Sequence, residues 1–188
     1  MFQYIPKKSR EIYNEKIAHR GFHLIFPENS IPAYIEAINR NLAIELDVRL
    51  TSDGEIICMH DRHIKRLLGK KGTTSKLDYT TIKGCTILDS KERVPKLAEI
   101  IKLVDGKVTL LIEIKGYFNN SFKEKLIKTL ENYEGKVYFH AKNIFTYHAL
   151  RKIWKEKVFW ILNPLRKRFD FIKKKEYKKI LRNDYNRA

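Results

Sequence analysis

Short apolar runs alternate with amphipathic helical patterns along most of this chain, and this alternation constrains the fold more than any other feature. Strand-like runs cover residues 16–19, 43–48, 56–60, 108–115, 137–140 and 158–162. Helical spacing of apolar residues occupies the intervening segments 30–40, 97–104 and 122–133. Strands that alternate with helices form a parallel sheet, either open or closed. The sequence therefore predicts an α/β fold.

The first predicted helix has recognisable ends. Asn29 or Ser30 is placed to act as its N-cap, and Asn41 is placed to end it in the left-handed conformation. One later connection departs from the alternation. Residues 48–55 read VRLTSDGE, and the Ser-Asp-Gly triplet is typical of a tight turn within an antiparallel hairpin.

The net charge indicates which classes of partner this chain could bind, and the cysteine content and the lack of long apolar runs indicate its cellular compartment. The 188 residues suffice for one domain, and 39 Lys and Arg against 22 Asp and Glu give a net charge of +17. Such a surface attracts phosphate groups, whether on nucleic acid, an anionic membrane or a small substrate. Cys58 and Cys85 are too few for a disulfide framework, so we expect free, buried thiols. No apolar run has the length of a signal peptide or a membrane span, so we expect a cytoplasmic protein.

The C-terminal segment 165–188 is strongly basic and differs in composition from the rest. Its apolar residues could share one helical face, which predicts a basic helical tail following a domain over residues 1–164. A solvated helix, a contact with an anionic membrane surface and a contact with nucleic acid are all compatible with this pattern.

Acidic residues within the apolar strand-like runs are the first candidates for a functional site. Glu45 and Asp47 project to the same side of one strand because side chains alternate, and Glu113 and Lys115 do so on another. Buried carboxylates are costly without positive compensation, and three of them suit a hard divalent cation such as Mg²⁺ or Ca²⁺. Alternatively, Glu45 or Glu113 pairs with Lys115 or with Arg20.

Two histidines occupy matching positions. His19 and His60 each close a strand and precede a charged residue, a setting compatible with general acid and base chemistry as well as with a structural role. The other histidines are interpreted as surface or packing residues, although one of them also ends a strand and could face the same region: His23, His63, His140 and His148.

A series of short motifs, in order and spacing, resembles the glycerophosphodiester phosphodiesterase family. The motifs are Ala18-His19-Arg20-Gly21, Pro27-Glu28-Asn29-Ser30, Ile44-Glu45-Leu46-Asp47-Val48, Leu50-Thr51-Ser52-Asp53-Gly54, His60-Asp61, Val94-Pro95-Lys96-Leu97 and Leu111-Ile112-Glu113-Ile114-Lys115-Gly116. They cover residues 16 to about 116.

This resemblance implies a TIM-type (β/α) barrel with its site at the carboxyl ends of the strands. It implies an enzyme that hydrolyses a glycerophosphodiester to glycerol 3-phosphate and an alcohol. The family pattern would place the residues as follows: metal ligands Glu45, Asp47 and Glu113; base His19 and acid His60; phosphate contacts Arg20 and Lys115. The family connects its second and third strands by an extended return without a regular helix, which would replace the hairpin interpretation.

The resemblance weakens toward the C-terminus. A barrel of this type usually needs about 250 residues, and the family's final strands have no evident counterpart after residue 162. Where the family tends to place Ser-Phe, this chain has His140-Ala141-Lys142-Asn143. We therefore expect a barrel that is shortened or incomplete at its C-terminal end. The alternative function is an impaired barrel that binds phosphate-bearing partners through its basic surface, with an anionic membrane favoured over nucleic acid.

Overall fold

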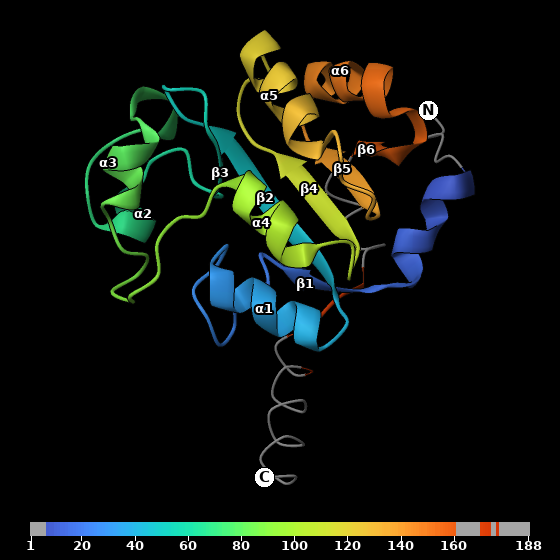
Figure 1. Cartoon of the computed structure of the whole chain (residues 1–188), viewed down its shortest axis with the longest axis horizontal. Helices are drawn as coiled ribbons and strands as arrows, with labels where there is room; N and C mark the ends of the chain where they lie inside the picture. Colours follow the sequence, from blue (N-terminus) through green and yellow to red (C-terminus); the bar gives the residue numbers. More distant parts are fainter. Residues whose placement is uncertain (1–6, 161–169, 174–175, 177–188) are drawn as a thin grey trace, which may run out of the picture.

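A computed structural model describes residues 7–160, 170–173 and 176 (Figure 1). The strands are β1 Lys16–His19, β2 Ala43–Leu50, β3 Ile56–Cys58, β4 Leu110–Ile114, β5 Val137–Ala141, β6 Val158–Trp160 and β7 Asp170–Phe171. The α-helices are α1 Ile31–Asn39, α2 Lys65–Leu68, α3 Tyr79–Lys83, α4 Leu97–Val104, α5 Asn120–Leu130 and α6 Ile144–Trp154. Three 3₁₀ helices are η1 Lys7–Asn14, η2 Thr74–Lys76 and η3 Lys155–Lys157. None of the helices in the described residues is long and apolar enough to cross a membrane.

The strands form one sheet in the order β6-β5-β4-β2-β1-β7, and every pair along this order is parallel. Helices α1, α4, α5 and α6 connect successive parallel strands, as in a (β/α) barrel. No pairing joins the two ends of this order, β6 and β7, within the described residues. The predicted α/β fold of the TIM-barrel type is therefore confirmed, and the sheet is not closed within the described residues.

Strand β3 lies outside this parallel order because it pairs with β2 in antiparallel fashion, with Val48 opposite Cys58 and Leu50 opposite Ile56. The intervening turn is closed by Thr51, whose Oγ1 accepts a hydrogen bond from the Glu55 backbone N–H at 2.9 Å. The hairpin indicated by the Ser-Asp-Gly triplet is thus confirmed. The extended return implied by the family resemblance is wrong, although no helix separates the two strands.

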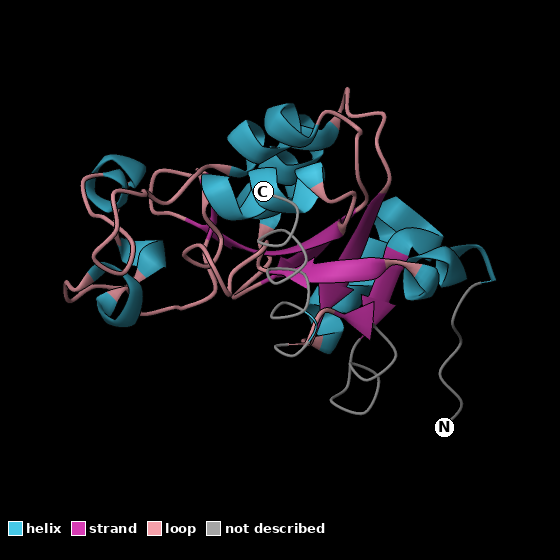
Figure 2. Ribbon diagram, turned by 90° about the horizontal axis from the view of Figure 1, so that it is seen from below, coloured by secondary structure: helices cyan, strands magenta, loops and turns pink. Residues whose placement is uncertain are grey.

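The two faces of the sheet bury different sets of residues. On the outer face, helices including α1 and α4 cover a large core that contains Ile44, Leu46 and Ile112 (Figure 1). The alternate residues of the same strands point inward, and the lower inward layer, which includes Ile17 and Leu111, is apolar. Figure 2 shows the segment with α2 and α3 beside this sheet. It packs around a separate apolar cluster against β3.

Both ends of α1 lie at residues that the sequence predicts. Ser30 is the N-cap, since its side chain accepts a hydrogen bond from the Ala33 backbone N–H. Asn41 follows the helix with φ +51°, as predicted. Asn29 is not the cap. Its side chain instead contacts Asp47 in the interior of the sheet.

The predicted tail is only partly within the described residues. Asp170–Phe171 forms β7 beside β1, so these two residues belong to the sheet and not to a helix. Residues 161–169, 174–175 and 177–188 lie outside the described part, together with the predicted membrane contact. The proposed boundary between residues 164 and 165 stays a prediction. Cys58 and Cys85 are free and buried.

Candidate active site

The predicted site residues gather at the carboxyl ends of neighbouring strands. His19 ends β1 and lies opposite Glu45 of β2, in register. One layer higher, Asp47 of β2 lies opposite Glu113 of β4. Parallel strands in register direct such side chains to the same face. The upper inward layer of the sheet is therefore acidic, above the apolar one.

Three buried carboxylates lie at this end of the sheet, with Glu45 one layer below Asp47 and Glu113. Glu45 is 2% exposed, Asp47 is 0% exposed and Glu113 is 5% exposed. The Lys115 Nζ lies 3.1 Å from Asp47 Oδ1 and 2.5 Å from Glu113 Oε1. Arg20 Nε lies 3.3 Å from Asp47 Oδ2, and the Arg20 backbone N–H donates to Glu45 Oε2 at 2.9 Å. Arg20 and Lys115 thus serve three carboxylates, and the exposed Lys142 adds a contact to Glu113 alone, with its Nζ 3.5 Å from Oε1. The Lys115–Glu113 pair confirms one of the ion pairs considered from the sequence.

The unequal distribution of these cations affects the pKa of each carboxyl group. Burial raises the pKa of Glu45 well above its usual value, and the charges of Asp47 and Glu113 raise it further. Burial also opposes ionisation of Asp47, but Lys115 and Arg20 outweigh it and hold the Asp47 pKa below its usual value. Glu45 is therefore the only one of these three carboxyl groups whose pKa is raised, since the pKa of Glu113 is lowered by His140 and Lys115 against burial.

Asp47 is further fixed by a buried amide. The Asn29 side chain donates from Nδ2 to Asp47 Oδ2 at 3.1 Å and accepts from the Asp47 backbone N–H at 3.2 Å. The Tyr34 hydroxyl donates to Asn29 Oδ1 at 2.8 Å. The Pro-Glu-Asn-Ser motif thereby fixes the orientation of one carboxylate from the start of α1.

The two predicted catalytic histidines lie on different sides of the carboxylates. His19 Nε2 is 3.8 Å from Glu45 Oε2, and the His19 ring packs edge-on against His23. His23, predicted to be a surface or packing residue, packs in this way and contacts the His19 carbonyl oxygen. His60 Nδ1 is 2.8 Å from Asp61 Oδ1, and its side chain is 33% exposed. The charge of His60 also contributes to lowering the pKa of Asp47.

The chain turns sharply directly after His19. Arg20 and Gly21 both have positive φ values, +56° and +73°. A Cβ atom on residue 21 would lie 2.9 Å from backbone and side-chain atoms of Ala33, so glycine is required by space as well as by conformation. This turn brings the Arg20 side chain back over Asp47.

A network of ion pairs joins the two histidine segments, and sequence reasoning missed its central residue. Arg66 of α2 donates to both oxygens of Glu28, at 2.9 and 2.8 Å, and to Asp61 Oδ2 at 2.5 Å. Glu28 in turn accepts from Arg20 Nη1 at 2.8 Å, and Asp61 contacts His60. The sequence offers only an exposed basic run at this position, because the partners of Arg66 lie 5 and 38 residues away.

From the sequence, His140 is interpreted as a surface or packing residue that could face the region of the site. The structure places its side chain beside the carboxylates. It lies opposite Glu113 in the β4–β5 register, is 4% exposed, and has Nδ1 3.4 Å from Glu113 Oε2. Burial lowers its pKa to about 4, so the imidazole is neutral near pH 7. The other two histidines in that group, His63 and His148, are exposed, as predicted.

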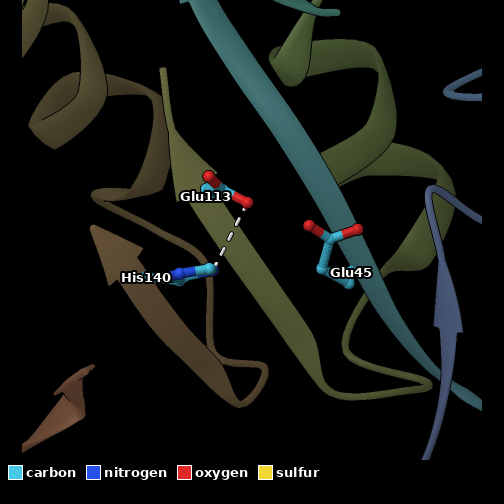
Figure 3. A group of neighbouring side chains, drawn as sticks. All are labelled: Glu45, Glu113 and His140. Carbon is cyan, nitrogen blue, oxygen red and sulfur yellow. Dashed lines mark ion pairs between the residues drawn. The ribbon is translucent and has the colours of Figure 1, made fainter. Parts of the chain in front are cut away.

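The side chains present fit a divalent cation. Ligand atoms of Glu45, Glu113 and His140 all lie within 4.8 Å of one another, on strands β2, β4 and β5 (Figure 3). Carboxylate oxygens and a neutral imidazole are both established metal ligands. Asp47 is the neighbour of this group but not a member of it.

A cleft of about 580 Å³ opens beside Lys115. Basic and aromatic residues line part of it, including Arg49, Arg62 and Tyr117. Arg49 also donates two hydrogen bonds to the His60 carbonyl oxygen, at 2.9 and 2.6 Å. The cleft can therefore accommodate a polar or anionic group next to the carboxylate cluster.

The family model of the glycerophosphoryl diester phosphodiesterase family matches residues 19–160, which contain all of these site residues. The chain belongs to this family. Membership of the glycerophosphoryl diester phosphodiesterase family agrees with the resemblance carried by the short motifs.

Similar proteins support this assignment. A glycerophosphodiester phosphodiesterase of Caldanaerobacter subterraneus subsp. tengcongensis is 34% identical over 152 residues, which are 73% of this chain and 61% of that protein. A glycerophosphodiester phosphodiesterase of Bacillus altitudinis is 30% identical over 149 residues, which are 71% of this chain and 61% of that protein. The chain thus spans about three fifths of the length of these two family members.

Solved structures of other family members share the fold. A phosphodiesterase of Oleispira antarctica, in complex with the product sn-glycerol-3-phosphate, superposes with a TM-score of 0.70 at 22% identity, covering 77% of this chain and 63% of that chain. A glycerophosphodiester phosphodiesterase of Agrobacterium tumefaciens gives a TM-score of 0.68 at 22% identity, covering 76% and 64%.

Proposed function

We propose that this chain hydrolyses phosphodiesters, and glycerophosphodiesters in particular, to glycerol 3-phosphate and an alcohol in a reaction that depends on a divalent cation. The observation that carries the proposal is the group of three buried carboxylates with Arg20 and Lys115 at the carboxyl ends of the strands. Family membership and the names of the relatives point to the same reaction.

The proposed roles follow from charge. Glu45, Asp47 and Glu113 would hold a Mg²⁺ or Ca²⁺ ion, which would offset negative charge on the phosphate oxygens. Arg20 and Lys115 would contact the non-bridging oxygens of the phosphate. Because negative charge grows on these oxygens as phosphorus is attacked, the two cations would stabilise the transition state more than the ground state.

The two histidines would move the protons. His19 would accept the proton of the attacking hydroxyl, either of water or of the glycerol itself, as a new P–O bond forms. His60 would donate a proton to the oxygen of the leaving alcohol as the other P–O bond breaks. The contact of His60 Nδ1 with Asp61 Oδ1 at 2.8 Å supports this assignment, because it fixes the orientation of the imidazole ring. The cleft beside Lys115 would receive the alcohol.

The test is release of glycerol 3-phosphate from glycerophosphocholine and a panel of related diesters. We expect EDTA to abolish turnover, and His19→Ala or His60→Ala to lower kcat by about 10²- to 10⁴-fold. His63→Ala, an exposed histidine in the same segment, is the matched control and should retain activity. A folded protein without turnover on any of these diesters would contradict the proposal.

The same preparation addresses the alternative of a non-enzymatic binder. Binding to anionic vesicles that weakens with salt, survives Glu45→Gln and Glu113→Gln, and is not accompanied by hydrolysis would favour it.

A further inference from the structure

The imidazole of His140 is buried without satisfying its polar atoms. The residue is 4% exposed, and its Nε2 atom has no hydrogen-bond partner among the described residues. Burial of a polar atom without a partner is destabilising, so each instance calls for an explanation such as a bound ion. An apolar side chain would fill this position on β5 without that cost.

The position of His140 brings its ring beside the carboxylates, with Nδ1 3.4 Å from Glu113 Oε2. It lies in the same layer of the sheet as Asp47 and Glu113, on the third of three adjacent parallel strands. Figure 3 shows its ring on the same face as the Glu45 and Glu113 carboxylates. Their ligand atoms lie within 4.8 Å of one another. Two ligands on opposite sides of one Zn²⁺-sized ion are about 4 Å apart, so a small movement brings all three onto one ion.

The ion pairs in the cluster distinguish Glu45 from the other two carboxylates. Asp47 already has ion pairs with both Arg20 and Lys115, and its position is fixed by Asn29. Glu45 receives a backbone hydrogen bond from Arg20 and lies 3.8 Å from His19 Nε2. Glu113 pairs with Lys115 and with Lys142. Glu45 is therefore the carboxylate at which a cation would add positive charge that lysine and arginine side chains of the described residues do not already supply.

We propose that His140 is a nitrogen ligand of the divalent ion in this chain, together with Glu45 and Glu113, and that the site prefers a first-row transition metal such as Mn²⁺, Co²⁺ or Zn²⁺ to Ca²⁺. This inference rests on the metal dependence in the proposed function and refines its ligand set. Imidazole suits transition metals, whereas Ca²⁺ and Mg²⁺ favour oxygen ligands only.

The test measures metal binding without substrate. Metal-free protein is loaded with Mn²⁺, and pulsed electron paramagnetic resonance detects coupling between the ion and a ligand ¹⁴N nucleus. We expect this coupling in the unaltered chain and in His148→Ala, the exposed control on α6. We expect its loss in His140→Ala. His19→Gln should retain the coupling, which separates His140 from the other histidine near Glu45.

Calorimetric titration gives a second readout. His140→Ala should weaken Zn²⁺ binding by about 10-fold or more, with a much smaller change for Ca²⁺. If His140→Ala does not fold, His140→Gln, which fills the space and keeps polar atoms, takes its place. Nitrogen coupling that persists in the folded variant, or equal losses of Zn²⁺ and Ca²⁺ affinity, would overturn the inference. Neither measurement needs turnover, so an inactive protein would refute the proposed function and leave this result standing.

Discussion

Replacement of Lys115 by methionine tests whether the carboxylate cluster is held together by charge. Lys115 is 9% exposed, and its Nζ pairs with both Asp47 and Glu113. Methionine has nearly the same length without the charge, so Lys115→Met removes the ion pairs and keeps most of the packing. In this variant, the remaining lysine and arginine partners of the three carboxylates within the described residues would be Arg20, which pairs with Asp47, and the exposed Lys142, which pairs with Glu113.

The magnitude follows from burial. Removing one partner of a buried ion pair costs about 3–5 kcal/mol, and 1 kcal/mol shifts the Tm of a domain of this size by about 2–4 °C. We therefore expect Lys115→Met to lower Tm by roughly 6–20 °C in EDTA at pH 7. A divalent ion at 100 times its Kd adds about 2.7 kcal/mol to the free energy of unfolding. We expect this gain to be larger in the variant, because the ion replaces the lost positive charge.

Differential scanning calorimetry, with EDTA and with excess Mn²⁺, measures both effects. The matched control is Lys142→Met, since Lys142 Nζ lies 3.5 Å from Glu113 Oε1 but its side chain is 55% exposed. An exposed pair of this kind contributes little, so the control should melt close to the unaltered chain. If the two variants have the same Tm in EDTA, the reasoning about buried charge at this site is refuted.

Three further predictions concern the loops around the site. Gly21→Ala should lower Tm more than Gly69→Ala, because both glycines have positive φ but only residue 21 lacks space for a Cβ atom; equal Tm values would contradict this. The hydrogen bond from Arg66 lowers the pKa of Asp61 to about 2, although burial acts in the opposite direction. The ionised Asp61 therefore stabilises the folded state above about pH 4, and this contribution is lost as the pH falls toward 2. Asp61→Asn should therefore lose less stability than the unaltered chain in urea unfolding between pH 5 and 2.5, and parallel curves would count against it. Arg66→Gln should lower kcat about 10-fold or more by releasing Glu28 and Asp61; unchanged kcat on glycerophosphocholine would exclude this role.

Local sequence patterns determined much of the fold. The apolar runs and helical spacings predicted β1, β2, β4 and β5 and the helices α1, α4 and α5, because these signals depend on neighbours within a few residues. The Ser-Asp-Gly turn predicted the β2–β3 hairpin for the same reason, and it was more reliable there than the family resemblance. The inward direction of Glu45, Asp47 and Glu113 followed from the two-residue period of a strand.

Only the tertiary structure decided which groups meet. His140 and Glu113 are 27 residues apart, and nothing local shows that β5 places the ring beside that carboxylate, in register and out of reach of water. Arg66 is likewise an ordinary surface residue until α2 brings it between Glu28 and Asp61. The charge balance of the site is a sum over residues from several strands and loops. It was therefore set by strand order and register, whereas the sequence alone determined which side chains were available to take part.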